Sequence, residues 1–211
     1  MASTLKINNL DTASGTTITV PTGKTIIGTD TGSIKAPGTP LQVVYAIIQS
    51  HPQYSSTSYV ATDVQVAITP KFADSKFLIE GVYSTGTNAG TSNSHDCMAG
   101  INIRDSLNPS GANAAIVTDN ASGAGSSRTG TFVCMPSTAQ VALAMTYFVH
   151  HIPLTFLYTP SYQNTNARTF GYLIKVGNST QGTTQNMSDQ NVDDRRDIRV
   201  SSFIKVTEIA Q

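Results

Sequence analysis

Residues 58–70 read SYVATDVQVAITP, and this stretch decides the fold class because polar and apolar side chains alternate along it. Four apolar residues share one face, namely Val60, Val64, Val66 and Ile68. The opposite face carries Asp63, Gln65 and Thr69. Successive side chains of a strand point to opposite faces, so the pattern predicts a strand with one buried face.

The same alternation recurs at 141–151, 169–177 and 199–210. The second of these segments aligns Phe170, Tyr172, Ile174 and Val176 on one face, and the third aligns Val200, Ile204 and Val206. Shorter apolar runs lie at 42–49, 76–84, 98–104, 132–135 and 153–158. Together they predict about eight to ten strands without a helix, and hence an all-β fold with an antiparallel, jelly-roll-like β-sandwich.

The composition favours strands and excludes several function classes. The chain has 211 residues, 12% charged side chains and no formal net charge, and its only two glutamates are Glu80 and Glu208. A neutral chain lacks the electrostatic hold that nucleic acid or an anionic membrane would require. No segment has the length of a membrane span or the pattern of a signal peptide, so we expect assembly in a cytoplasm without membrane insertion.

An eight-residue repeat occupies the N-terminal region, with aliphatic side chains at Leu10, Ile18, Ile26 and Ile34. The VPTGKT sequence at 20–25 is not expected to bind a nucleotide, because Ile18 stands where a phosphate-binding loop needs its first glycine. Each repeat can form a short strand but no core of its own. We therefore predict that these four residues contact identical copies around the axis of a homotrimer. The alternative is a disordered leader rich in threonine and glycine.

The turn-rich sequence APGTP at 36–40 marks a change of sequence pattern, from the eight-residue repeat to longer alternating runs. Residues 1–40 are predicted to form an attachment and trimerisation segment that is ordered by its contacts. Residues 41–211 hold nearly all the alternating strands, so we predict that they form a β-sandwich head domain that folds independently.

Five segments carry a resemblance to a known group of proteins: MASTLKINNL at 1–10, ITPKFADSKFLIEG at 68–81, PLTFLYTP at 153–160, TFGYLIKVG at 169–177 and SSFIKVTEIA at 201–210. The chain resembles bacteriophage virion proteins, especially tail-fibre-like and spike proteins of marine and cyanobacterial phages. The resemblance implies a trimeric virion appendage with an N-terminal attachment segment and a C-terminal head, assembled in the host bacterial cytoplasm. The N-terminal segment is short for the stalk of a long fibre, which keeps decoration of the capsid or collar open.

The function expected from the resemblance is that of a non-enzymatic virion structural protein without a cofactor. Its partners would be other copies of the chain, other virion proteins of the tail, collar or capsid, and a glycan of the host surface. A capsid or collar decoration protein without receptor binding is the first alternative. A polysaccharide depolymerase is the second, although the chain has no GxSxG motif and no obvious pair of placed carboxylates.

Histidines and cysteines are the residues whose chemistry most needs an explanation. His150 and His151 are adjacent, so in a strand they face opposite ways and cannot hold one metal ion together. His95 and Cys97 would share a face, but no further ligand lies nearby in the sequence, and a metal site is not expected. Cys97 and Cys134 are expected to be packed free thiols, with a disulfide as the alternative.

Two polar segments are the candidates for binding a ligand or a partner. The first is YTPSYQNTNAR at 158–168, in which Tyr158, Tyr162 and Arg168 could contact a sugar. The second is DDRRD at 193–197, which supplies Asp193, Asp194, Arg195 and Arg196. Aromatic faces pack on sugar C–H groups while charged groups bond the hydroxyls, so we predict glycan or virion-protein recognition there. The alternative for each residue is a solvated loop.

Overall fold

The computed structural model describes residues 22–28, 35–88, 99–116, 133–134, 149–176, 182–186 and 200–211. This part of the chain contains ten strands and no helix, which confirms the predicted all-β fold. The strands are β1 (Pro40–Ile48), β2 (Gln53–Tyr54), β3 (Val60–Ile68), β4 (Lys76–Asn88), β5 (Ala99–Asp105), β6 (Val133–Cys134), β7 (Val149–Tyr158), β8 (Arg168–Val176), β9 (Gly182–Gln185) and β10 (Ser202–Ile209).

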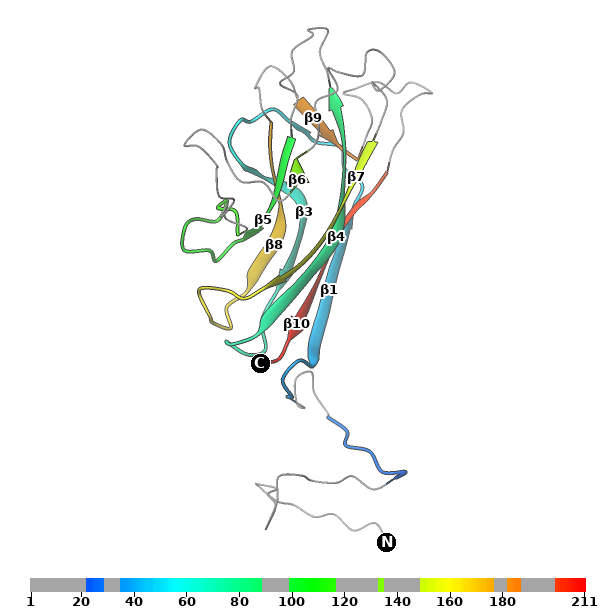
Figure 1. Ribbon diagram of the computed structural model, residues 1–211, viewed down its shortest axis with the longest axis vertical. Coiled ribbons are helices and arrows are strands. Elements are labelled where there is room, and N and C mark those ends of the chain that lie inside the picture. The colour runs from blue at the N-terminus through cyan, green and yellow to red at the C-terminus, as the bar shows by residue number, and fades with distance from the viewer. Residues whose placement is uncertain are drawn as a thin grey trace.

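Six strands form the first sheet, which we call sheet A, around the long strand β4. One edge of β4 pairs with β7, and the other pairs first with β10 and then with β9. β1 pairs with β10 and β2 with β9, so β1, β10, β4 and β7 lie side by side across the sheet (Figure 1). All of these pairings are antiparallel.

The second sheet, sheet B, has the strand order β3-β8-β5-β6 and is also antiparallel. The predicted strand at 58–70 is β3, with a register irregularity against β8 between Ala61 and Gln65. The two sheets face each other across a common core, as a β-sandwich does. The finer assignment of a jelly roll stays a prediction.

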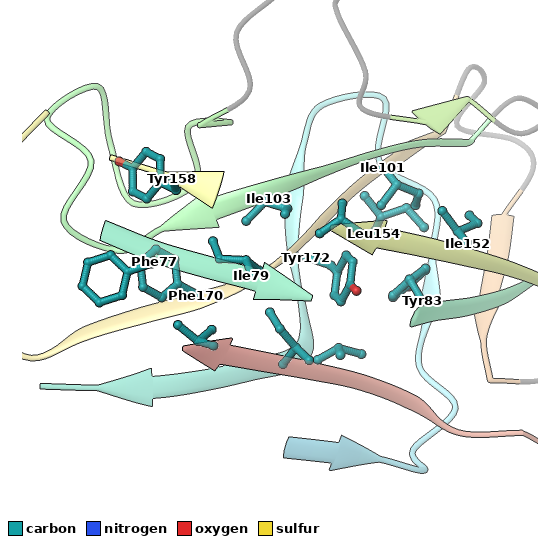
Figure 2. Packing of buried hydrophobic residues seen from close by; sticks show 14 of the residues in the cluster. Phe77, Ile79, Tyr83, Ile101, Ile103, Ile152, Leu154, Tyr158, Phe170 and Tyr172 are labelled. Atoms are coloured by element: carbon teal, nitrogen blue, oxygen red, sulfur yellow. The ribbon is translucent and has the colours of Figure 1, made fainter. Parts of the chain in front are cut away.

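The core lies between the sheets and is built from the predicted alternating faces. Phe170, Tyr172 and Ile174 of β8 are fully buried, and Val176 nearly so. Aromatic pairs join the sheets: the rings of Phe77 and Phe170 have centroids 5.0 Å apart, and those of Tyr83 and Tyr172 are 5.3 Å apart (Figure 2). In β3, Val64 and Ile68 are buried, whereas Val60 and Val66 are partly buried.

The sandwich has two ends that differ in what they connect. At the first, which we call the entry end, β1 begins and β10 ends, and the chain arrives from the N-terminal segment (Figure 1). At the second, the far end, β4 ends, β5 begins, β7 begins and β8 ends. The strand ends that flank residues 89–98 and 177–181 therefore lie at the far end. No helix of the described residues is long and apolar enough to cross a membrane.

Candidate functional site

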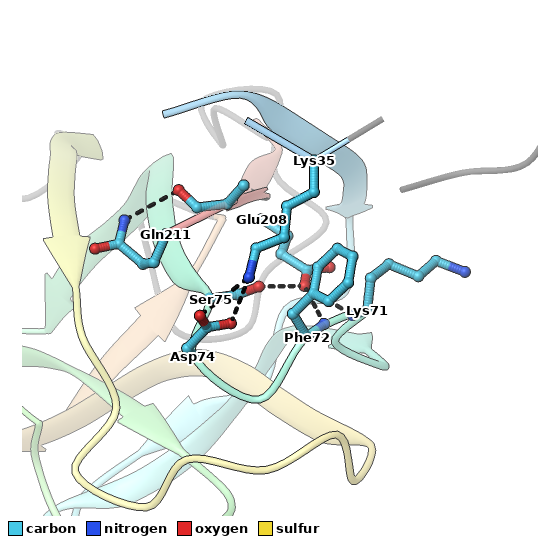
Figure 3. Close-up of polar contacts among 8 residues, drawn as sticks. Lys35, Lys71, Phe72, Asp74, Ser75, Glu208 and Gln211 are labelled. Atoms are coloured by element: carbon cyan, nitrogen blue, oxygen red, sulfur yellow. Dashed lines mark hydrogen bonds and ion pairs between the residues drawn. The ribbon is translucent and has the colours of Figure 1, made fainter. Parts of the chain in front are cut away.

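A buried carboxylate organises the entry end. Glu208 of β10 is fully buried, and its Oε1 accepts hydrogen bonds from the backbone nitrogen of Lys71 at 2.7 Å and from Ser75 Oγ at 2.6 Å. The backbone nitrogen of Phe72 lies 3.3 Å from the same oxygen, and Gln42 Nε2 donates to Oε2 at 2.5 Å. Glu208 therefore fixes the turn between β3 and β4 to β10 (Figure 3), and its bond with Gln42 extends the connection to β1. These donors give the buried carboxylate of Glu208 its hydrogen-bond partners.

The turn fixed by Glu208 receives the N-terminal segment. Lys35 Nζ lies 3.0 Å from Asp74 Oδ2 and 4.5 Å from the centroid of the Phe72 ring (Figure 3). Gly38 donates its backbone N–H to the carbonyl of Ala210, and Ala210 donates to the carbonyl of Thr39, both at 2.9 Å. Residues 35–39 are thus joined to the head by backbone bonds and by one exposed ion pair.

The ion pair between Lys35 and Asp74 changes the pKa of Asp74. The hydrogen bond from Lys35 lowers the pKa of Asp74 from its usual value, and the charge of Lys35 acts in the same direction. The ionised carboxylate of Asp74 therefore stabilises the junction when the pH is above the usual pKa of an aspartate. This stabilisation is lost as the pH falls through the lowered pKa of Asp74.

The structure corrects the first predicted ligand segment, because two of its three residues are buried. Arg168 begins β8 with an exposure of 1%, and its Nη1 lies 2.8 Å from Asp105 Oδ2. Tyr158 ends β7 and is only 9% exposed, where burial raises its pKa to about 12. A buried ion pair and a buried phenol hold the core together here, so neither residue can contact a glycan.

Tyr162 keeps the properties expected of a contact residue. Its side chain is 55% exposed, and its carbonyl accepts a hydrogen bond from Arg168 Nη2 at 3.0 Å. The loop that carries it joins β7 to β8 at the entry end, beside the point where β4 begins. The sequence indicated this loop through its tyrosines and Arg168, but it could not show that Arg168 points inward.

A second polar cluster, which the sequence did not reveal, surrounds Asn186. This residue has a φ of 57°, in the left-handed region that asparagine tolerates. Its Nδ2 donates to the carbonyls of Ile48 at 2.9 Å and Ser50 at 3.0 Å, and Ser202 Oγ donates to its Oδ1 at 2.6 Å. The backbone nitrogen of Val200 donates to the carbonyl of Asn186 at 3.0 Å.

The Asn186 cluster bears on the second predicted ligand segment. Asp193, Asp194, Arg195 and Arg196 lie outside the described residues, as does Asp197. The described residues on either side of them, Asn186 and Val200, are hydrogen-bonded to each other between β9 and β10. The described residues Asn186 and Val200 therefore lie together at one point of sheet A, away from the loop that carries Tyr162.

The two adjacent histidines have separate environments. His151 Nδ1 lies 2.9 Å from Ser84 Oγ, on the strand that pairs with β7. Burial lowers the pKa of His150, and the neighbouring His151 lowers it further. Within the described ranges no group of three or more histidine, cysteine or acidic side chains is placed to hold a metal ion.

Of the four aliphatic positions of the repeat, the structure describes one. Ile26 is 62% exposed, and its neighbour Ile27 is 81% exposed. Leu10, Ile18 and Ile34 lie outside the described residues, as do His95 and Cys97. Cys134 is described only as part of the backbone of β6, so the state of the two thiols stays a prediction.

The two glutamates stand on opposite faces of sheet A. Glu80 lies on the outer face, where its Oε2 is 2.8 Å from Lys205 Nζ, whereas Glu208 lies on the inner face opposite Phe77. Two carboxylates separated by a sheet cannot flank one glycosidic bond.

No protein-family model matches the chain, and no curated protein matches it either.

Proposed function

We propose that this protein is a virion structural protein of a bacteriophage, a short homotrimeric spike or fibre. Its N-terminal segment fastens it to the particle, and its β-sandwich head is exposed for adhesion to a host-surface glycan. The kind of particle is inferred from the resemblance of segments 1–10, 68–81, 153–160, 169–177 and 201–210 to phage appendage proteins. The arrangement on the particle is inferred from the two ends of the head.

The observation that carries the proposal is the separation of these ends. The N-terminal segment joins the head at the entry end, through Lys35 and the backbone bonds of Gly38 and Thr39. The strand ends flanking 89–98 and 177–181 lie at the far end. A molecule that is held at one end and recognises a surface with the other needs this division. Loops supported by a rigid scaffold commonly carry such recognition.

The burial of Tyr158 and Arg168 shifts the proposed recognition surface. Tyr162 is exposed but lies at the entry end, so we propose it for contact with a neighbouring virion protein. For glycan contact we propose the segment that contains Asp193, Asp194, Arg195 and Arg196. Its charged side chains can bond sugar hydroxyls, and its flanking residues are fixed by the Asn186 cluster.

The test is complementation of a phage that lacks the gene. Full-length protein should enter particles and restore adsorption. Protein without residues 1–40 should stay out of particles, because it lacks the proposed attachment segment. Replacing Asp193, Asp194, Arg195 and Arg196 by serine should leave incorporation intact and reduce adsorption at least about tenfold, the effect of losing roughly 1.4 kcal/mol of binding.

Each other outcome points to a different function. Loss of particle integrity with normal adsorption would favour a capsid or collar decoration protein. Release of reducing sugar from host polysaccharide would favour a depolymerase. Particles of the parent phage that never contain this protein would contradict the proposal as a whole.

A further inference from the structure

The outer face of sheet A carries apolar side chains on each of the four strands β1, β10, β4 and β7. We call it the outer A face and define it by three rows of paired residues that run across β1, β10, β4 and β7. The rows are Ile47–Phe203–Val82–Pro153, Tyr45–Lys205–Glu80–Thr155 and Val43–Thr207–Leu78–Leu157. Two of the three rows contain almost only apolar side chains.

These side chains are exposed in the single chain. Tyr45 is 70% exposed, Ile47 60% and Val43 54%, and on the neighbouring strands Leu157 is 54% and Phe203 39% exposed. In an antiparallel sandwich, the outward positions usually carry polar residues. Sheet B follows this rule at Gln65, Arg104 and Lys175. Exposed apolar side chains gathered on one face of a sheet in this way mark an interaction surface.

The charges on the outer A face fit a neutral, apolar partner. The middle row contains one positive and one negative side chain, and they pair with each other, with Lys205 Nζ 2.8 Å from Glu80 Oε2. The chain as a whole has no formal net charge, so two copies do not repel each other. An acidic or basic partner would find no unbalanced charge in these rows.

The position of the N-terminal segment identifies the partner. β1 contributes three of the most exposed apolar residues, and it follows directly on residues 35–39. The chain before Lys35 includes the exposed Ile26 and Ile27 and the aliphatic repeat that is proposed to join copies. Copies joined there hold their β1 strands at a high effective concentration, because each β1 is tethered to the junction.

We propose that the outer A face is where the heads of neighbouring copies of this chain contact one another. This inference rests on the proposed homotrimer and adds the surface that completes it. Four strands about 4.8 Å apart make a face about 19 Å wide. Three such faces arranged as a triangle leave a centre about 5–6 Å from each sheet. Side chains fill this distance, since two facing sheets pack about 10 Å apart.

The test uses the full-length chain and two matched double variants. The first is Tyr45→Glu with Phe203→Glu, which places unpaired charges in the outer A face. The control is Gln65→Glu with Lys175→Glu, which places two carboxylates at outer positions of sheet B, one of them in place of a positive charge. Oligomer mass is measured by light scattering across a dilution series, and folding is checked by circular dichroism. If the double variant fails to fold, the milder variant Ile47→Thr takes its place. It keeps a β-branched residue and reduces the apolar surface.

The proposal expects the parent to be oligomeric and the face variant to dissociate at concentrations at least about 30-fold higher, as for a central interface residue. The control should dissociate like the parent. If the parent is a trimer, and Ile47→Thr and the face variant both dissociate at the same concentration as the parent, this inference is overturned and the proposed trimer stands. A parent dimer that the face variant dissociates supports the face and contradicts the trimer. A parent monomer overturns both.

Discussion

Glu208 joins three parts of the chain that are far apart in the sequence. Its carboxylate accepts two backbone N–H groups and one hydroxyl from the turn after β3, and one amide hydrogen from Gln42 of β1. Hydrogen bonds to a charged group are stronger than those between neutral groups, and a buried donor without an acceptor costs further free energy. A single side chain therefore holds the turn that receives the N-terminal segment.

Glu208→Gln should lower the free energy of unfolding by about 3 kcal/mol, because the amide nitrogen of glutamine would face donors in place of an acceptor. Asp74→Asn is the matched control, since Asp74 is exposed and pairs with Lys35 at the junction. Its effect should be much smaller than that of Glu208→Gln. Urea unfolding of the parent and both variants measures these values. Equal losses in the two variants would contradict the role assigned to Glu208.

The alternating pattern could not reveal such a residue. It correctly places Val206 and Ile204 toward the core, but the partners of Glu208 lie more than 130 positions away along the chain. Arg168 is a second case, because its partner Asp105 belongs to a strand that only the fold brings near. Local sequence predicts which way a side chain points, whereas its partners depend on strand order.

At the scale of the strands, the sequence predicts the elements whose faces are separated by polarity. The runs at 42–49, 76–84 and 169–177 correspond to β1, β4 and β8. The short strands β2 and β9 were not predicted, because two to four residues are too few to establish a period. The run at 141–151 is described only from Val149 onward, where β7 begins.

β4 also contains a position that only a glycine can fill. A Cβ on Gly81 would overlap the carbonyl oxygen of Phe203 and lie 2.6 Å from the hydroxyl of Tyr172. Gly81 faces inward between Ile79 and Tyr83, so its missing side chain makes room for a tyrosine of the opposite sheet. The packing of Tyr172 against Tyr83 depends on this space.

Gly81→Ala should therefore lower the free energy of unfolding by about 3 kcal/mol, the upper range for overpacking a core. Thr69→Ala, at an exposed position directly after β3, is the control, and it should cost less than about 1 kcal/mol. Thermal unfolding followed by circular dichroism compares the two. If Gly81→Ala unfolds at the same temperature as the parent, sheets A and B can shift apart without cost and the packing described here is wrong.

At the scale of the whole molecule, the two ends of the sandwich separate segments that the sequence presents as one group. The predicted ligand segments at 158–168 and 193–197 are both rich in polar residues. The first lies at the entry end, and the residues that flank the second are fixed by Asn186 in another part of sheet A. Composition identifies surface loops, but strand direction decides to which end each loop belongs.

The junction at the entry end leads to a prediction about where the head begins. Deleting residues 1–34 keeps the backbone bonds that join Gly38 and Thr39 to Ala210, whereas deleting residues 1–40 removes them. Both fragments should fold, because the core residues lie between Leu41 and Ala210. Two backbone hydrogen bonds contribute about 1 kcal/mol each, so the shorter fragment should unfold about 4–8 °C lower. Calorimetry of the two fragments measures the difference.

If their midpoints coincide, residues 35–40 add nothing to the head and belong with the attachment segment. If the longer fragment does not fold, the head needs its N-terminal segment, and the two parts of the chain are not independent.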